Sequence, residues 1–497
     1  AELGLLVEAA SGCAGPCGLA RAIRSSDAPG ARTFLTSSSA AALKHWPAAR
    51  GHHVLRLLVD AAQAHLARHR DCGWLFLNLC LRVALALTGL GRAGAEPDAP
   101  LLTRPAALRG LALSAAWLEE ALSEEKCACR HALDWSDLTS ALAVLRSSLC
   151  KPVATAAPED ARHLSVAILE AFLHVLPSCA DAGGPSAEAN IRYAWFCGPD
   201  VSWSTALHGL LLDTPAAAAL GPDSRAGQDS RLALFTASLE QWLPGAAGDD
   251  SHPIGLEAYT VESQYPVSLG DADMLRQWEL TQFGHLAEAL LAAGVGVLAC
   301  QKLVDPWLVD ELRHRGVTVL SRLSLRHVDH VQRLTGAVPV SSLAAPPRRW
   351  ADVCGDVGPI EFRTIQDRTY TVVHPPSCRS AARQRAAGLA PTRVSTLLVG
   401  APDEHALAEL RQCVPQAVHA LQEAAHAGAA LHGGGLTEVH LADVLAARGR
   451  RLLEETGDAA GAGAVRVISE CLLDVAACLP AGSGGPGGVL LGRGEFL

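Results

Sequence analysis

The sequence has 497 residues, which is long for a single hydrophobic core and predicts about two to four domains. Its net charge of −10, with no basic run beyond what a solvated surface needs, argues against a nucleic-acid-binding protein. The 15 cysteines are odd in number and irregularly spaced, so a reducing compartment is favoured over a disulfide framework. Alanine and leucine are abundant, which favours helices.

The region up to about residue 125 has a mostly helical pattern. It starts inside an apolar helix pattern at Ala1 without a signal-peptide sequence, so we expect the chain to lack its own N-terminus. The sequence Gly15-Pro16-Cys17-Gly18 then marks a turn. From His52 to Arg70, apolar residues recur on one helical stripe, which predicts an amphipathic helix.

The apolar run from Trp74 to Leu90 raises the question of a membrane span. Asn78 and Arg82 interrupt this run, and it is shorter than a comfortable bilayer crossing. We therefore predict a helix buried in the centre of a domain, and no membrane span.

Two cysteines and a histidine lie close together in sequence, at Cys127, Cys129 and His131. Thiolate and imidazole groups are zinc ligands, but structural zinc sites need four ligands, and a second pair at suitable spacing is missing. The sequence therefore argues against a metal site at these residues.

The middle of the chain has a clear pattern of alternating elements. Val295 to Cys300 is an apolar run typical of a strand, and Asp305 is a good N-cap for the helix that follows. Val317 to Leu320 is a second strand-like run, after which Ser324 can cap a helix that ends at Gly336. Strand, helix, strand and helix with short connections predict a parallel βαβα unit with a right-handed crossover.

Further elements flank this unit. Arg231 to Phe235 is a predicted buried strand, whereas the Gly- and Asp-rich stretch from Pro244 to Pro253 and the polar run from Ser377 to Gln384 are predicted loops. No Gly-x-Gly-x-x-Gly follows a strand in the βαβα unit, so a small-molecule enzyme with a dinucleotide fold is disfavoured.

The chain then returns to a helical pattern. Arg393 to Val399 predicts a strand and Gly400 a turn, followed by a long helix that Pro415 is expected to kink. Its apolar stripe consists of Leu407, Leu410, Val414, Ala417 and Leu421.

Two helices are predicted near the C-terminal end. Gly433 to Gly435 opens the first, which is expected to run through Leu445, and Val465 to Leu479 forms the second. Ala481 to Gly488 has the composition of a flexible linker.

The amino-acid sequences of several segments resemble those of group II chaperonins, the CCT/TRiC and thermosome superfamily. Gly294–Gln301, Gly316–Leu320 and Leu334–Ala337 are similar to consecutive segments of the chaperonin apical domain. Arg146–Lys151 is similar to a motif of the intermediate domain, and Leu431–Ala442 resembles the McKusick–Kaufman/Bardet–Biedl syndrome branch of the superfamily. The resemblance covers nearly the whole chain.

The resemblance implies a multi-domain α/β fold with a helical equatorial domain, an intermediate domain and an α/β apical domain that binds clients, the last entered through a strand at Leu207–Asp213. Chaperonins continue beyond the end of this sequence, so the C-terminal equatorial part is expected to be truncated. The implied boundaries are 1–125 for the first equatorial part, 126–203 for the first intermediate part, 204–387 for the apical domain, 388–428 for the second intermediate part and 429–497 for the incomplete second equatorial part.

The resemblance also implies where ATP and Mg²⁺ would bind and be hydrolysed. Ser38 stands where the family has one aspartate, and Gln416 where it has the aspartate that activates water, so no catalytic residue is expected. An amide cannot accept a proton as a carboxylate does, and lost general-base help costs about a hundredfold to ten-thousandfold in rate. Asp71 keeps the family's magnesium ligand, but the two hydroxyl residues that follow in the family are missing.

We therefore expect ATP and Mg²⁺ to bind weakly if they bind, and hydrolysis to be lost. Asp71 is either a surviving magnesium ligand or only a helix N-cap. Gly434 and Gly435 either touch the nucleotide or only allow a tight helix entry. The resemblance places three further nucleotide contacts in the first turn, at Gly15, Pro16 and Gly18.

The function that the resemblance implies is a chaperonin-like assembly factor. It would bind client subunits and help to assemble the BBSome with sister chaperonin-like proteins and CCT/TRiC, in support of cilium formation. The expected location is the cytoplasm, centrosome and ciliary basal body. The alternative is an ATP-hydrolysing subunit of a protein-folding chaperonin, which the residues at Ser38 and Gln416 disfavour.

Overall fold

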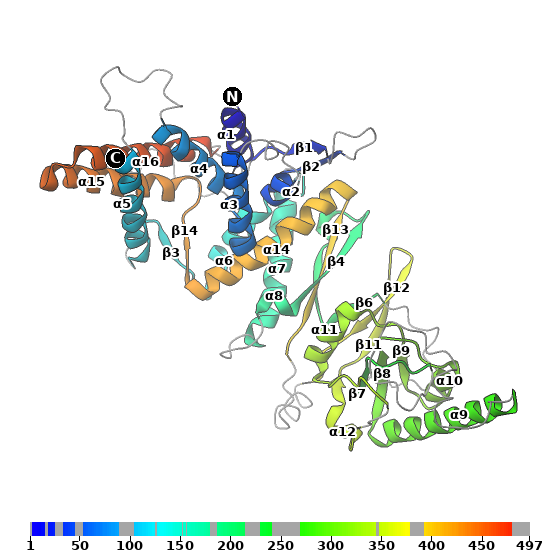
Figure 1. The fold of residues 1–497 in the computed structure, drawn as a ribbon. Coiled ribbons are helices and arrows are strands. Elements are labelled where there is room, and N and C mark those ends of the chain that lie inside the picture. The colour runs from blue at the N-terminus through cyan, green and yellow to red at the C-terminus, as the bar shows by residue number, and fades with distance from the viewer. Residues whose placement is uncertain are drawn as a thin grey trace, which may run out of the picture. The chain divides into compact units, whose positions relative to one another are not determined.

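A computed structural model gives the fold of the chain, which divides into two compact units. Unit 1 comprises residues 1–169, 195–205 and 399–497, and unit 2 comprises residues 170–194 and 206–398. The structure describes residues 2–14, 18–24, 33–44, 53–88, 104–124, 127–151, 153–155, 157–178, 186–213, 229–240, 269–343, 347–377 and 392–479. Unit 2 is therefore an insertion within unit 1, and the chain is a mixed α/β protein (Figure 1).

Unit 1 is mainly helical (Figure 1). Two small antiparallel ribbons accompany the helices, one formed by β1 (Arg21–Arg24) and β2 (Thr33–Thr36), the other by β3 (Arg130–Ala132) and β14 (Ala429–Leu431). Its helices are α1 (Glu2–Cys13), α2 (Ser39–Lys44), α3 (His53–His69), α4 (Gly73–Thr88), α5 (Arg104–Ser123), α6 (Thr139–Leu149), α14 (Glu404–Ala427), α15 (Leu436–Thr456) and α16 (Ala459–Cys478), with a 3-10 turn at Val201–Trp203.

Helix α4 lies at the centre of unit 1, as its apolar sequence predicts. Leu77 and Leu81 are fully buried, and α4 packs against α1, α3 and α16. The helices from the two ends of the chain therefore close one core together. This packing is the reason that the run starting at Trp74 is so apolar.

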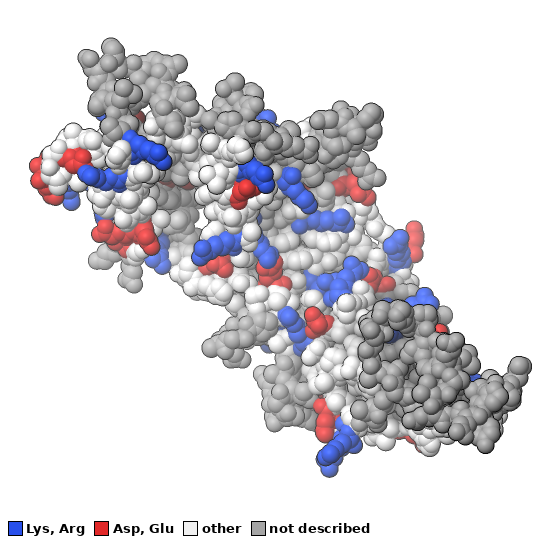
Figure 2. Space-filling model, viewed as in Figure 1, with Lys and Arg blue, Asp and Glu red and all other residues white. Residues whose placement is uncertain are grey.

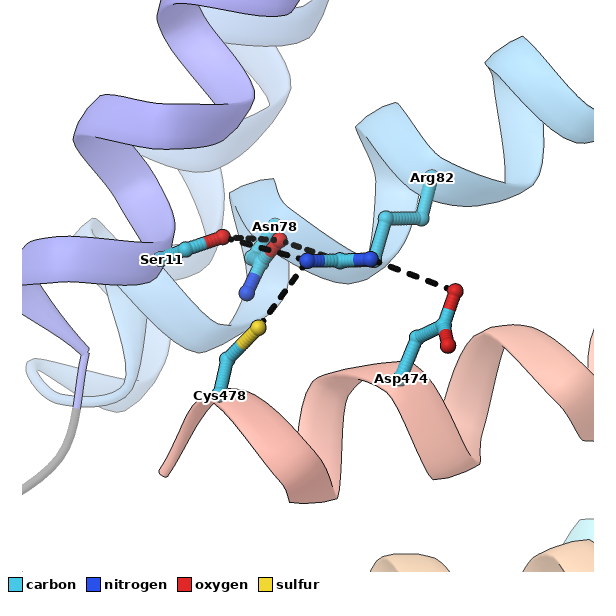
Figure 3. A network of polar contacts seen from close by, with 5 residues as sticks. All are labelled: Ser11, Asn78, Arg82, Asp474 and Cys478. Atoms are coloured by element: carbon cyan, nitrogen blue, oxygen red, sulfur yellow. Dashed lines mark hydrogen bonds and ion pairs between the residues drawn. The ribbon is translucent and has the colours of Figure 1, made fainter. Parts of the chain in front are cut away.

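A polar network inside this core involves the two residues that interrupt the apolar run (Figure 3). The Asn78 side-chain oxygen accepts hydrogen bonds from Arg82 (2.9 Å) and Ser11 (3.3 Å). Arg82 also pairs with Asp474 at 3.2 Å and donates to the sulfur of Cys478 at 2.9 Å. Because Asn78 is fully buried, these bonds satisfy its side-chain oxygen in place of water, and together with the bonds of Arg82 they connect α1, α4 and α16.

Unit 2 contains a four-stranded sheet with the order β10-β7-β8-β9, in which β7, β8 and β9 are parallel and β10 is antiparallel to β7. A second sheet is antiparallel, with the order β11-β12-β6. The strands are β6 (Leu210–Leu212), β7 (Ser230–Phe235), β8 (Val295–Cys300), β9 (Thr318–Leu320), β10 (Gly355–Val357), β11 (Ile360–Ile365) and β12 (Arg368–Val373). The helices are α8 (Ala187–Asn190), α9 (Leu269–Ala292), α10 (Pro306–His314), α11 (Leu325–Thr335) and α12 (Trp350–Val353), with a 3-10 turn at Leu176–Ser178.

The parallel strands of unit 2 are covered on both faces. All six residues of β8 are buried, and from Val297 to Cys300 they alternate between two cores. Leu298 and Cys300 belong to the core that α9 and α10 cover, whereas Val297 and Ala299 belong to the core that α11 and β6 cover. A strand buried on both faces has a continuous apolar sequence, which is why this segment was recognisable.

The predicted βαβα unit is confirmed. The Asp305 carboxylate accepts the backbone N–H of Trp307 at 2.9 Å, so it caps α10 as predicted. Gly336 ends α11 in the left-handed conformation at φ 71°. Ser324 occupies the N-cap position of α11, but its side chain makes no capping hydrogen bond there.

Four elements contain residues of both units: α7 (Pro158–Val175), β4 (Ile191–Cys197), β5 (Thr205–His208) and β13 (Ser395–Ala401). The prediction of a turn at Gly400 is wrong, because Gly400 lies inside β13. A side chain at Gly400 would come within 2.8 Å of the Asp200 carbonyl oxygen, so the glycine allows close packing and does not mark a turn.

Two other predictions need correction in detail. The strand expected at Leu207–Asp213 is interrupted at Gly209 (φ 141°), so it forms the end of β5 and the separate β6. The helix expected to end at Leu445 runs on to Thr456. The predicted loop at Pro244–Pro253 and linker at Ala481–Gly488 lie outside the described residues, as do residues 378–391. The finer division into equatorial, intermediate and apical parts stays a prediction.

Candidate functional site

The turn after β2, where the resemblance places the first lost aspartate, is tied to a buried carboxylate. Glu409 of α14 is only 2% exposed. It accepts hydrogen bonds from the Thr36 hydroxyl at 2.8 Å and the Ser37 backbone N–H at 3.0 Å, and a short one from the Ser37 hydroxyl. Three donors therefore satisfy a charge that would otherwise be costly to bury.

Helix α14 positions Glu409 through its N-terminus and its apolar stripe. Asp403 caps the helix by accepting the backbone N–H groups of His405 and Ala406, both at 2.8 Å. The buried stripe then includes Glu409 between apolar residues. Sequence reasoning missed Glu409, although a carboxylate at a buried position of an apolar stripe was a usable signal.

Ser38 lies in the same turn, and its side chain is 8% exposed. Among the described residues, its hydroxyl is one of the buried groups without a hydrogen-bond partner. Its backbone N–H donates to the Thr36 hydroxyl at 3.0 Å. Ser38 carries no charge, and it lies where the resemblance places an aspartate of the family.

Asp71 lies in a tight turn before α4. One of its carboxylate oxygens accepts the backbone N–H of Cys72 at 2.7 Å, and the other accepts the Ser148 hydroxyl at 3.1 Å. Arg70 and Cys72 on either side have positive φ angles of 59° and 60°. These bonds hold the turn and connect it to α6, and neither goes to an N–H group of α4 itself.

The structure brings the Asp71 turn and the Ser38 turn together. The indole N–H of Trp74, which is 6% exposed, donates to the Ser37 carbonyl oxygen at 3.0 Å. A side chain at Gly73 would come within 2.5 Å of the Ser39 hydroxyl, so the two turns are in close contact. The indole thus fills space beside the turn and bonds to it.

A buried thiol reports on the charges around this site. Burial raises the pKa of Cys413, one turn after Glu409 on α14, to about 12. The carboxylates of Glu409 and Asp71 contribute smaller parts of this increase in pKa, and the ammonium group of Lys151 opposes it. Two carboxylates and one lysine therefore act on the same small region.

The glycines named from the sequence have structural roles near helix ends. Gly18 packs against the Cys13 carbonyl oxygen, where a side chain would clash. Gly434 and Gly435 precede α15 with φ angles of 69° and 89°, and a side chain at Gly435 would lie 3.1 Å from Ala476 of α16. Tight helix entry accounts for Gly435. Gly15 and Pro16 lie outside the described residues.

Gln416 lies on α14, two turns beyond Glu409, and is half-buried. In the described part of the chain its side chain has no hydrogen-bond partner, so no bond ties it to the cluster around Glu409. The nucleotide and magnesium roles of Gly15, Pro16, Gly18, Asp71, Gly434 and Gly435 stay predictions.

The groups that would have to bind Mg²⁺ and a triphosphate already form hydrogen bonds within the protein. Glu409 already takes the donors of the Ser37 turn, and its negative charge would repel a phosphate. Both oxygens of Asp71 accept protein hydrogen bonds, and the Trp74 indole occupies the adjoining space. The residues in this site therefore do not fit a magnesium triphosphate, and we derive no hydrolytic step from them.

Unit 1 is a helical core made from both ends of the chain, and unit 2 is an α/β insertion between them. This mixed α/β fold fits a chaperonin subunit. Residues 6–480 match the TCP-1/cpn60 chaperonin family, and the chain belongs to this family. It is 26% identical over 448 residues to the proteins named molecular chaperone MKKS from Mus musculus and from Homo sapiens. Each match covers 88% of this chain and 69% of the relative.

A more distant relative is the thermosome subunit alpha of Thermoplasma acidophilum, 26% identical over 194 residues, which are 38% of this chain and 33% of that protein. The resemblance that the sequence motifs indicated is thus confirmed, both for the family and for the MKKS relatives.

No described helix is long and apolar enough to cross a bilayer. On the face drawn in Figure 2, the acidic and basic side chains of the described residues are interspersed.

Proposed function

We propose that this chain is a chaperonin-like assembly factor that binds client proteins through unit 2 and does not hydrolyse ATP. The observation that carries the proposal is a set of exposed apolar side chains on α9, in the segment before α10 and at the start of α10. Its members are Met274, Trp278, Leu303 and Trp307, which we call the α9–α10 patch. Met274 is 70% exposed, and the other three are between 37% and 39% exposed.

Two contacts hold the elements of this patch together. The guanidinium of Arg276 on α9 pairs at 2.8 Å with Asp305, the residue that caps α10. The Trp307 ring faces α9 at Gly284, where a side chain would lie 3.8 Å from it. Large apolar side chains that stay exposed on a rigid frame favour binding of apolar segments of another protein.

Loss of ATP turnover is supported by the site in unit 1. The Thr36 hydroxyl and both donors of Ser37 already bind Glu409, and Gln416 offers no carboxylate to activate water. These observations disfavour the alternative, an ATP-hydrolysing chaperonin subunit.

The biological role that we propose rests on the resemblance of the motifs, and the MKKS relatives are named molecular chaperones. We propose that the chain works with sister chaperonin-like proteins and CCT/TRiC, and that its clients are subunits of the BBSome. It would thereby support cilium formation in the cytoplasm and at the centrosome and ciliary basal body.

Client capture by the full chain tests the proposal. The probe is a chemically unfolded protein, whose aggregation is followed by light scattering and whose binding is measured by co-sedimentation. We expect Met274→Glu to weaken capture about tenfold, because it removes apolar contact and adds a charge in the patch. Leu57→Glu on α3 is the matched control, since Leu57 is also 70% exposed, and capture should stay unchanged. Equal capture by both variants would contradict the assignment to the patch.

A phosphate-release assay with magnesium ATP, paired with calorimetry, separates the two functions. We expect no release above a protein-free blank, whether or not the calorimeter detects binding. Release that disappears in Asp71→Ala would support the ATP-hydrolysing alternative and would contradict our proposal.

A further inference from the structure

Three potential metal ligands from different segments of unit 1 lie together, and none of them belongs to the cluster around Glu409. They are the two cysteines of the segment before β3, Cys127 and Cys129, and His440 on α15. Their ligand atoms all lie within 4.8 Å of one another, and the two sulfurs are 2.8 Å apart. Cys127 is 7% exposed and Cys129 3% exposed, and His440 is half-buried.

The backbone brings these segments together independently of any ion. The β3–β14 ribbon continues past its paired residues, because the His432 N–H donates to the Cys129 carbonyl oxygen at 2.9 Å. Thr437 then donates to the His432 carbonyl oxygen at 2.6 Å, which fixes the start of α15 to the end of the ribbon. His440 follows Thr437 by one helical turn, and this places its ring beside the thiols.

The histidine that completes the set is not the one that the sequence suggested. His131, two residues after Cys129, contacts the ring of His432 instead, with the ring centroids 5.8 Å apart. His440 lies more than 300 residues further along the chain than Cys129, so no local spacing could reveal it. Among the described residues, these two cysteines and one histidine are the one group of three or more Cys, His, Asp or Glu side chains whose ligand atoms lie close enough together to hold an ion.

The chemistry of the set favours a borderline-soft divalent cation. Two thiolates and one imidazole are common ligands of Zn²⁺, and the two thiolate charges balance the charge of the ion. A sulfur separation of 2.8 Å is too long for a disulfide, whose bond is about 2.05 Å. Around tetrahedral zinc, with Zn–S bonds of about 2.3 Å, the sulfurs would lie about 3.8 Å apart, so binding has to separate them by about 1 Å. Rotation of one thiol about its Cα–Cβ bond supplies such a movement.

We propose that Cys127, Cys129 and His440 bind one Zn²⁺ ion, which fastens the β3–β14 ribbon to α15. Each cysteine gives up its thiol proton to solvent when its sulfur binds the ion, and His440 binds as neutral imidazole. Three protein ligands leave the fourth position of the ion to water or to a group from another molecule. The site is independent of client binding and of the Glu409 cluster.

Cobalt substitution in the full chain tests this site. The protein is reduced, treated with a chelator, freed of both reagents and titrated with Co²⁺, whose thiolate complexes absorb in the near ultraviolet. We expect a thiolate-to-cobalt band that saturates at one equivalent and disappears when Zn²⁺ is added. The Cys127→Ser/Cys129→Ser double variant should lose the band, and His440→Gln should weaken binding by at least about a hundredfold.

Two control variants separate this site from other thiols and imidazoles. Cys197→Ser removes an exposed cysteine outside the group, and His131→Gln removes the neighbouring histidine, so both should bind cobalt as the unaltered chain does. Circular dichroism checks that each variant folds. If the double variant does not fold, His440→Gln decides alone, because it leaves both thiols in place. Absence of the band, unchanged cobalt affinity in His440→Gln, or formation of a Cys127–Cys129 disulfide in preference to cobalt binding would overturn the proposal.

Discussion

At the scale of single residues, the site in unit 1 is defined by a group that the sequence motifs did not single out. Glu409 is buried, and its carboxylate holds the turn that contains Ser38, where the resemblance places an aspartate of the family. Its partners Thr36 and Ser37 are more than 370 residues away in the sequence. A buried carboxylate can therefore serve as a fastener between distant segments when enough donors surround it.

Replacing the carboxylate by an amide tests this role. In Glu409→Gln, one accepting oxygen becomes an NH2 group that faces the donors of Thr36 or Ser37, so hydrogen bonds are lost in a buried place. We expect a loss of about 1–3 kcal/mol in the free energy of unfolding, measured by urea denaturation. Glu404→Gln in the exposed first turn of the same helix should cost less than about 1 kcal/mol. Equal effects of the two substitutions would show that Glu409 does not fasten the turn.

At the scale of elements, one residue at the start of α10 makes two different stabilising interactions. Asp305 caps the helix through the Trp307 N–H and also pairs with Arg276 of α9, while being only 3% exposed. The cap was predictable, because N-cap preferences act within a few residues. The ion pair was not, since it depends on how α9 packs beside α10.

Two substitutions at Asp305 separate these roles. Asp305→Asn keeps a capping oxygen but removes the charge, whereas Asp305→Ala removes both interactions and leaves Arg276 without this partner. We expect Asp305→Ala to lower the free energy of unfolding by about 1–3 kcal/mol and Asp305→Asn by a smaller amount. Chemical denaturation of the full chain measures both. If the asparagine variant were as unstable as the alanine variant, the ion pair with Arg276, and not the N-cap hydrogen bond, would be the interaction that stabilises α10.

At the scale of the whole molecule, unit 1 is assembled from both ends of the chain. Helix α16 packs against α5, α4, α1 and α15, and the network around Arg82 connects it to α4 (Figure 3). The contact with α5 is close at Gly110, where a side chain would collide with Ala464. Unit 1 is therefore complete only when the residues that follow unit 2 in the sequence have packed against those that precede it.

Overpacking that contact tests the closure. Gly110→Val places a branched side chain against α16, and we expect a loss of about 1–3 kcal/mol or more in the stability of unit 1. Limited proteolysis should then cleave unit 1 at lower urea concentrations than in the unaltered chain, while cleavage in unit 2 is unchanged. Gly463→Ala in α16 is the control, because no atom lies within 4 Å of the added carbon, and it should leave stability unchanged or raise it. Parallel loss of both units in Gly110→Val would show that they unfold as one.

The sequence by itself determined the local elements and the family. The strand at Val295–Cys300, the capped α10 and the end of α11 at Gly336 follow from signals within a few residues, and the motif wording identified a chaperonin. Only the tertiary structure decided that Glu409 meets the Ser37 turn and that His440, not His131, lies beside Cys127 and Cys129. The physical reason is that capping and burial periodicity are encoded locally. Contacts between residues hundreds of positions apart depend instead on how whole helices pack.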